Sequence, residues 1–245
     1  MPFLKSYALT HVGKSRANNE DFFALNDDFG LYVLADGIGG HSFGEVAAEL
    51  ACKVTLEKFL EAYHLTEEFN EKSALALIKY AIHQANKAVF QKAKNDPMYK
   101  NMGTTLCVLC TLKDACIVAH VGDSRIYQYG ASFELLTQDH TIFAQSSPKS
   151  RSLRGKHFLT KTIGIKEFVE PDIQIFPCSK DDIFLICSDG LSDFLDKSSL
   201  EQTLKEGSSL EDMGNLLLEK ALTTEARDNI TFILVKPQFE ESALI

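Results

Sequence analysis

The sequence lacks any apolar run that approaches the ~20 residues a helix needs to cross a membrane. Its first six residues also lack the apolar core of a secretion signal. It contains neither repeats nor a low-complexity tail. These absences lead us to expect a cytoplasmic protein that makes no contact with membranes.

Positive charge is also scarce. The chain has 25 Lys and Arg residues against 34 Asp and Glu residues, which gives a net charge of −9. A nucleic-acid partner would require a basic stripe, so this balance argues against one. The apolar content of 45% and charged content of 24% are ordinary for a globular protein with a sizeable core.

A second cysteine pair, which a zinc ribbon would need, is missing. Cys107 and Cys110 have the spacing of one half of such a site, but they lie in an apolar strand where residues three apart face opposite sides. We therefore expect the six cysteines to be buried free thiols. The histidines are not spaced as zinc ligands, and no role is assigned to His64, His83 or His157.

The most informative features present are two apolar runs that each lead into Asp-Gly. Residues 31–35 precede Asp36, and residues 183–187 precede Asp189 after one serine. A continuous apolar run is typical of a strand buried on both faces, and the glycine allows a sharp turn. One such aspartate is more often a turn residue than a ligand.

Three further aspartates at the ends of apolar runs favour a ligand role over a turn role. Asp123 follows a third apolar run, while Asp21 and Asp228 stand directly before others. Antiparallel pairing brings the end of one strand beside the start of its neighbour, so all of these carboxylates can meet along one rim. Like charges repel and raise one another's pKa. The pattern therefore predicts a bound cation.

The oxygen-only donor set favours Mg²⁺, Mn²⁺ or Ca²⁺ over zinc. Two ions that share one aspartate would lie ~3.5–4 Å apart, the spacing used to activate a water against a phosphoester. Arg16, five residues before Asp21, is the candidate partner for phosphate oxygens. Its alternative interpretation is a surface arginine in a turn.

Apolar residues at helical spacing predict one helix around 46–54 and a longer one around 75–89. Asn95-Asp96-Pro97 should end the second helix, and Ser208-Ser209-Leu210-Glu211 should begin the last one. Strands, helices, strands, helices and a final strand follow one another in that order, which fits an α+β layer fold.

Six motifs carry a resemblance to a known family. In chain order they are Gly13-x-x-Arg16-x-x-Asn19-Glu20-Asp21, Ala35-Asp36-Gly37-Ile38-Gly39-Gly40-His41, Met102-Gly103-Thr104-Thr105, His120-Val121-Gly122-Asp123-Ser124-Arg125, Cys187-Ser188-Asp189-Gly190-Leu191 and Arg227-Asp228-Asn229. From about Gly13 to Val235 the chain resembles the protein phosphatase 2C family of metal-dependent Ser/Thr phosphatases, in the compact form typical of bacteria. The resemblance implies a four-layer α-β-β-α sandwich of two antiparallel sheets flanked by helices, with a dinuclear metal site in a cleft at one end. It also implies one phosphatase domain over residues 1–245.

The resemblance also implies a role for each ligand. Asp36 would bridge two Mn²⁺ or Mg²⁺ ions, and Asp189 and Asp228 would complete the first. Asp21 and the carbonyl of Gly37 would hold the second ion, mostly through waters. Asp123, together with Asp189, would hold a weaker third ion.

A metal-bridging water would then attack phosphorus without forming a phosphoenzyme, while Arg16 holds the phosphate. Ile38 stands where animal relatives have a histidine directly after Asp-Gly. His41 or a water on the third ion would therefore supply the proton to the leaving group. Asn229 and Asp139-His140 are interpreted as supporting or structural residues.

Residues 139–164 correspond to the family's flap beside the active site, here shortened. They include the basic residues Lys149, Arg151, Arg154 and Lys156. A polar, serine-rich segment of this kind is typical of an exposed loop. It is either a solvated linker or a lid that contacts the substrate.

The resemblance predicts hydrolysis of phosphoserine and phosphothreonine in proteins, by a monomer whose partners are a Ser/Thr kinase and its targets. Two other functions are considered. A catalytically weak phosphoprotein-binding module on the same fold would usually have lost metal carboxylates. A metal-dependent nuclease or phosphodiesterase would need a basic surface, which the acidic composition opposes.

Overall fold

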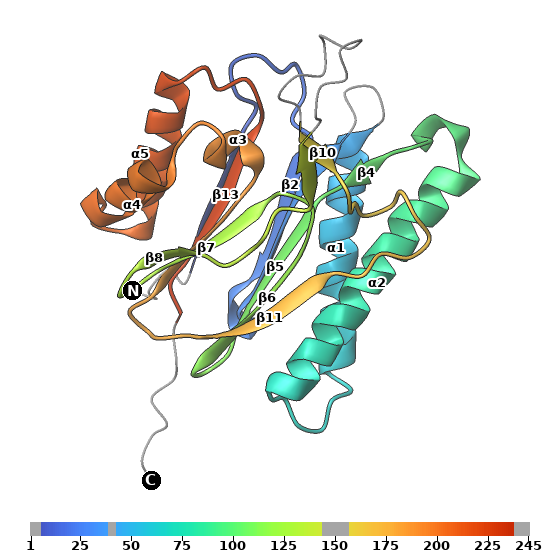
Figure 1. Cartoon of the computed structure of the whole chain (residues 1–245). Helices are drawn as coiled ribbons and strands as arrows, with labels where there is room; N and C mark the ends of the chain where they lie inside the picture. The colour runs from blue at the N-terminus through green and yellow to red at the C-terminus, as the bar shows by residue number, and fades with distance from the viewer. Residues whose placement is uncertain (1–5, 39–42, 144–156, 238–245) are drawn as a thin grey trace.

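The computed structural model describes residues 6–38, 43–143 and 157–237, and over these residues two antiparallel sheets lie face to face with helices on their outer sides (Figure 1). One sheet has the strand order β1-β13-β12-β7-β8 and the other β11-β6-β5-β3-β2. This arrangement confirms the predicted α-β-β-α sandwich.

The strands of the first sheet are β1 (Ser6–His11), β13 (Ile230–Val235), β12 (Ile183–Cys187), β7 (Arg125–Tyr129) and β8 (Phe133–Leu135). Those of the second are β11 (Asp172–Pro177), β6 (Ala115–Val121), β5 (Leu106–Thr111), β3 (Leu31–Ile38) and β2 (Asp21–Asn26), with β4 (Gly103–Thr104) paired to the end of β3. The central strands β3, β5, β6, β12 and β13 are the apolar runs of the sequence, and they are buried on both faces.

The helices cover the outer faces. The long pair α1 (Gly44–Tyr63) and α2 (Glu71–Asn95) packs on the second sheet, while α3 (Asp189–Ser192), α4 (Lys197–Glu206) and α5 (Leu210–Thr223) lie on the side of the first (Figure 1). Short 3₁₀ turns occur at η1 (Asp27–Phe29) and η2 (Pro97–Tyr99). None of the helices within the described residues is long and apolar enough to cross a membrane.

The helix ends follow their capping residues. Asn70 caps the start of α2 in a reciprocal hydrogen-bonded pair with Ser73, and Asp96-Pro97 ends the helix as predicted. Ser209 caps α5 by accepting a hydrogen bond from the Asp212 backbone N–H. Both long helices, α1 and α2, extend beyond the predicted ranges, and the added part of α1 continues its buried face with Phe59.

Apolar side chains form three layers, one between the two sheets and one between each sheet and its helices. Cys107 lies in the layer between the sheets and Cys110 in the layer beneath the long helices, as expected for strand residues three apart. All six cysteines of the sequence fall within the described residues, where each is buried and free.

The flap segment differs from the loop predicted for it. Its two ends form the antiparallel strands β9 (Thr141–Phe143) and β10 (His157–Leu159), with Ile142 opposite Phe158. β-Branched and aromatic residues at these positions favour strand pairing over an irregular loop. Residues 144–156, including the four basic residues named above, lie outside the described residues.

Asn86 on α2 fixes the chain just after the flap. Its side chain is buried, accepts a hydrogen bond from the Gly164 backbone N–H at 2.8 Å, and donates to the carbonyls of Lys166 and Glu167 at 3.1 and 3.0 Å. Gly164 adopts a positive φ of 88°, so this turn would be strained for other residues. One amide therefore holds residues 164–167 against the helix.

Replacing Asn86 by Ala should lower the free energy of unfolding by about 2–3 kcal/mol, because it leaves several backbone groups without partners. The melting temperature should fall accordingly, and chemical denaturation provides the measurement. Lys87→Ala is the control, since Lys87 is its exposed neighbour on the same helix. Equal stability of Asn86→Ala and Lys87→Ala would contradict this role.

Candidate active site

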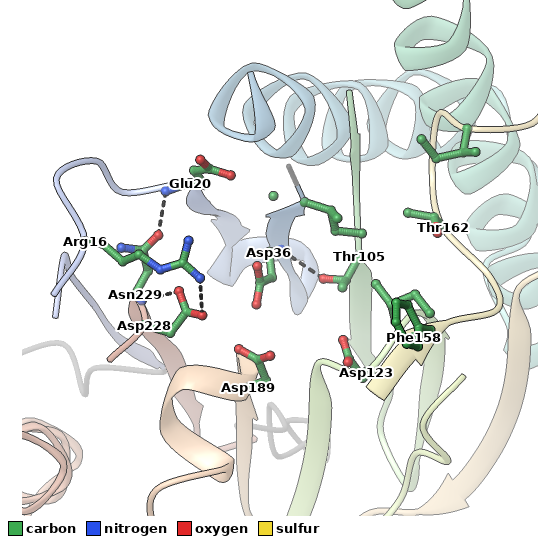
Figure 2. Close-up of a pocket in the computed structure, with 14 residues that line it drawn as sticks. Arg16, Glu20, Asp36, Thr105, Asp123, Phe158, Thr162, Asp189, Asp228 and Asn229 are labelled. Carbon is green, nitrogen blue, oxygen red and sulfur yellow. Dashed lines mark hydrogen bonds and ion pairs between the residues drawn. The ribbon is translucent and has the colours of Figure 1, made fainter. Parts of the chain in front are cut away.

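Four of the predicted aspartates line one pocket of about 430 Å³ at the upper end of the sandwich (Figure 2). Asp36 ends β3 and Asp123 follows β6, both from the second sheet. Asp189 begins α3 after β12, and Asp228 precedes β13, both from the first sheet. The expectation of a single rim was too simple, since the carboxylates approach from two sheets and meet where the sandwich opens.

Asp21, the fifth aspartate, lies directly opposite Asp36 in the pairing of β2 with β3. It is only 7% exposed, and its Oδ2 accepts a hydrogen bond from the Ser188 hydroxyl at 2.8 Å. Among the described residues that line the pocket, Asp21 is absent. It therefore lies behind the pocket wall and would reach a ligand there only indirectly.

The backbone of Asp36 is held by Thr104, the last residue of β4, and by Thr105, which follows it. Thr105 accepts a hydrogen bond from the Asp36 N–H through Oγ1 at 2.9 Å, and its own N–H donates to the Asp36 carbonyl at 2.8 Å. The Thr104 hydroxyl donates to the same carbonyl at 2.8 Å. The Thr104-Thr105 pair belongs to one of the six family motifs, and its contacts show that it fixes the end of β3.

Gly37 is required by close packing against the start of α1. A Cβ at Gly37 would lie 2.4 Å from the carbonyl of Gly44 and 2.6 Å from that of Glu20. The Gly37 N–H donates to the Glu20 carbonyl at 3.0 Å. This packing fixes the position of the Gly37 carbonyl, which the sequence analysis proposed as a ligand.

The carboxylates perturb one another strongly. Burial, followed by the charges of Asp123 and Asp228, raises the pKa of Asp189 to about 7. Burial is also the main cause that raises the pKa of Asp21 to about 6, and burial and Asp21 raise that of Asp36 well above its usual range. The site therefore favours either protons or cations over free carboxylates.

Arg16 lies on the loop between β1 and β2 at one side of the pocket. Its guanidinium donates to Asp228 Oδ2 at 2.6 Å and is 44% exposed on the pocket side. The loop is fixed by Asn229, whose Oδ1 accepts from the Glu20 N–H at 2.8 Å and whose Nδ2 donates to the carbonyls of Val12 and Asn18 at 2.9 Å. Asn229 is thus a supporting residue, as predicted.

The opposite wall of the pocket is mostly apolar. It is formed by Ile38, Phe158, Leu159, Thr162 and Ile165, and Figure 2 shows Phe158 and Thr162 across the carboxylates from Arg16. The ends of the flap segment therefore contribute to the pocket. His41, the candidate proton donor, lies outside the described residues.

Two histidines do gather with an acid, contrary to the expectation from their spacing in the sequence. His120 and His140 lie beside Asp172 with ligand-type atoms close enough for a metal ion. However, their rings stack with centroids 4.5 Å apart and planes at 10°. A metal lies in the plane of each imidazole that binds it, and one ion cannot lie in two nearly parallel, offset planes. The carboxylate pocket is the better metal site.

The donor set in that pocket fits divalent cations. It offers the carboxylate oxygens of four aspartates, which are ligands that Mg²⁺ and Mn²⁺ prefer. In the described residues, the cation that reaches these carboxylates is Arg16, which pairs with Asp228. Bound cations would relieve the repulsion that raises the other pKa values.

Comparisons with known proteins agree with this geometry. The family model described as protein phosphatase 2C matches residues 10–225. The serine/threonine phosphatase stp of Listeria welshimeri is 29% identical over 238 residues, with 93% of each chain covered, and the protein phosphatase PhpP of Streptococcus pneumoniae is 31% identical, with 96% of this chain and 98% of that protein covered.

Solved structures extend the agreement to three dimensions. The crystal structure of the serine/threonine phosphatase Stp1 from Staphylococcus aureus aligns with a TM-score of 0.82 and 28% identity, covering 97% of this chain and 96% of that one. The serine/threonine phosphatase PstP/Ppp of Mycobacterium tuberculosis aligns with a TM-score of 0.80 and 27% identity, covering 96% and 98%. Together with the family match over most of its length, these likenesses show that the chain belongs to the protein phosphatase 2C family.

Proposed function

We propose that this protein hydrolyses phosphoserine and phosphothreonine in phosphorylated proteins with the help of Mn²⁺ or Mg²⁺. The observation that carries the proposal is the meeting of carboxylates from both sheets in one pocket with the Arg16 guanidinium at its side. The relatives that match nearly the whole chain are serine/threonine phosphatases, which supports the same substrate class.

In this proposal each aspartate keeps the role that the family resemblance implies. Asp36 would bridge two ions, with Asp189 and Asp228 on one and Asp21 and the Gly37 carbonyl on the other. When bound, the ions supply an activated water for attack at phosphorus. The buried position of Asp21 fits contact through waters.

The protein's own contribution is to orient the phosphate. Arg16 is positioned by the loop that Asn229 holds, so its planar guanidinium can contact two phosphate oxygens at once. The apolar wall with Phe158 and Ile165 would face the part of the substrate that leaves. We further propose that the leaving oxygen would take its proton from His41, or from a water that an ion held near Asp123 would supply when bound.

A phosphoprotein-binding module without activity has no support, since every predicted carboxylate stands at or behind the pocket. We also propose that the protein acts as a cytoplasmic monomer on a Ser/Thr kinase and its substrates. The chemistry of the site carries the enzyme assignment, whereas these partners follow from the family.

Activity on a phosphothreonine peptide should require Mn²⁺ or Mg²⁺ and disappear with a chelator. It should persist after treatment with thiol reagents, because the cysteines are buried and burial raises the pKa of Cys110 and Cys187 to about 12. Asp36→Asn should remove nearly all turnover while the protein stays folded. Normal turnover of Asp36→Asn would contradict the bridging role, and faster cleavage of a phosphodiester than of the peptide would indicate the nuclease alternative.

Arg16→Ala should lower kcat/KM by about 30- to 150-fold, the effect of losing a charge-assisted contact worth ~2–3 kcal/mol. Arg16→Lys should recover only part of this loss, since ammonium lacks the planar fork. Lys14→Ala serves as the matched control, because Lys14 is a cation on the same loop that bonds the Thr224 carbonyl instead. An Arg16→Ala enzyme with parental kinetics would make this residue a turn residue only.

The metal-free protein should be less stable at high pH because of Asp189. Its folded-state pKa of about 7 exceeds the ordinary value of 3.8, so between these values the folded state binds more protons than the unfolded state. The stabilisation from this proton is complete below the unfolded pKa and is lost as pH rises through the folded pKa. Asp189→Asn, which lacks this titration, should therefore gain in melting temperature relative to the parent from about pH 5 to about pH 8.

Melting in the presence of a chelator measures this difference. Asp181→Asn, which removes an exposed carboxylate on the turn before β12, is the control for the loss of a charge outside the cluster. The same pH dependence in Asp189→Asn and Asp181→Asn would contradict the role of Asp189.

A further inference from the structure

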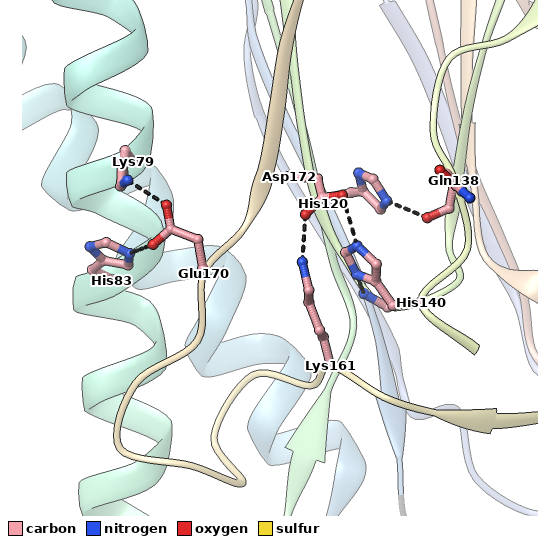
Figure 3. Close-up of polar contacts among 9 residues, drawn as sticks. Lys79, His83, His120, Gln138, His140, Lys161, Glu170 and Asp172 are labelled. Carbon is pink, nitrogen blue, oxygen red and sulfur yellow. Dashed lines mark hydrogen bonds and ion pairs between the residues drawn. The ribbon is translucent and has the colours of Figure 1, made fainter. Parts of the chain in front are cut away.

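We propose that His140 is a positioning residue that sets the place of Asp123, and with it the affinity of the weakest metal site. The inference rests on the proposed function, in which Asp123 holds a third ion. It is drawn from a group of side chains that lies outside the pocket, formed by the buried His120 and His140 with the partly exposed Lys161 and Asp172 (Figure 3).

His140 forms hydrogen bonds with both backbone groups of Gly122, the residue before Asp123. The Gly122 N–H donates to His140 Nδ1 at 3.1 Å, and the His140 backbone N–H donates to the Gly122 carbonyl at 2.9 Å. Gly122 has a φ of +109°, a conformation that other residues rarely adopt. The turn therefore depends on this external partner rather than on a strand neighbour.

The turn at Gly122 also packs against Thr105, the residue that holds the backbone of Asp36. A Cβ at Gly122 would lie 2.6 Å from the Thr105 side chain, and the Thr105 hydroxyl is 2.7 Å from that of Ser124. Thr105 in turn bonds the Asp36 backbone in both directions. A shift of Gly122 would therefore move Asp123 relative to Asp36.

The surroundings of His140 select one tautomer. Because Nδ1 accepts the Gly122 N–H, the ring proton lies on Nε2, which is 3.2 Å from Asp172 Oδ2 without the geometry of a hydrogen bond. Lys161 contacts the other oxygen of Asp172, and the His120 ring covers His140 from one side. The His140 side chain is only 9% exposed, so its acceptor is kept for Gly122.

The chain offers a matched set of residues that lacks this connection. On α2, His83 and Lys79 approach Glu170 in the same histidine–acid–lysine arrangement (Figure 3). His83 also contacts the Phe168 ring, and none of these residues lines the pocket. If His140 acted only by stabilising the fold through an ion pair, changes at His83 would have comparable consequences.

Two substitutions at His140 distinguish the roles of its two ring nitrogens. The Asn oxygen can take the place of Nδ1 and accept from Gly122, whereas Gln reaches the position of Nε2 and leaves Gly122 without an acceptor. His140→Gln should raise the Mn²⁺ concentration for half-maximal turnover by about 5- to 15-fold, the effect of one lost hydrogen bond. His140→Asn should stay within about threefold of the parent.

Calorimetric titration of the substrate-free protein with Mn²⁺ provides a second readout besides activity. His140→Gln should weaken the weakest binding step and leave the tighter steps unchanged, while His83→Gln should match the parent in both readouts. Equal titrations of His140→Gln and the parent would overturn the proposal. Equal weakening in His140→Gln and His140→Asn would also overturn it, since the Nδ1 acceptor would then have no special role.

Asp172→Asn covers the case in which His140→Gln does not fold. The Asp172 side chain is 42% exposed. Loss of its carboxylate should weaken the weakest Mn²⁺ binding step about two- to fourfold, because the His140 ring proton would no longer be held on Nε2. Glu170→Gln is its control, and equal titrations of these two variants would overturn the proposal.

Asp123→Ala separates this inference from the proposed function. If Asp123→Ala leaves the Mn²⁺ titration unchanged, Asp123 is no ligand and the proposed third site fails, which removes the basis of the inference. If Asp123→Ala weakens the last step and His140→Gln does not, only the positioning role fails.

Discussion

The gathering of carboxylates from two sheets at one end of the sandwich is the constraint that shapes this protein. Burial first, and then the charges of neighbouring aspartates, raises the pKa values of Asp36, Asp189 and Asp21. The sandwich around them supplies the apolar burial that keeps the groups in place. The fold therefore holds several negative charges close together, which is unfavourable without a counter-ion. A divalent cation is the counter-ion that suits these oxygen donors.

The apolar strands explain how much of the site could be predicted. Runs that end or begin at an aspartate placed Asp36, Asp189 and Asp228 at one end of the fold, because burial stops where the runs stop. The direct pairing of Asp21 with Asp36 also follows from neighbouring antiparallel strands. The division of these residues between two sheets could not be obtained this way, since apolar runs alone do not tell which strands pair.

Side-chain contacts between distant parts of the chain could not be predicted from the apolar runs. Asn229 holds the Arg16 loop across more than 200 positions of sequence, and Thr105 holds the backbone of Asp36. For each of these polar residues, the neighbouring sequence does not indicate which distant part of the chain its side chain contacts. The flap ends were expected as a loop for a similar reason, because three-residue strands are too short to show a clear alternation.

The histidine group shows why proximity of ligand atoms is a weaker criterion than their direction. His120, His140 and Asp172 lie close together, yet the stacked rings point their nitrogens along parallel planes, one towards the Gln138 carbonyl and the other towards Gly122 and Asp172. The carboxylates of the pocket are more dispersed, but they point into a common space from several strands (Figure 2). Asp36 stands on a strand and is fixed by the sheet itself, whereas Asp123 stands on a turn that needs an outside partner. Under the proposed ligand roles, that difference in backbone support would give the ion near Asp123 the lower affinity.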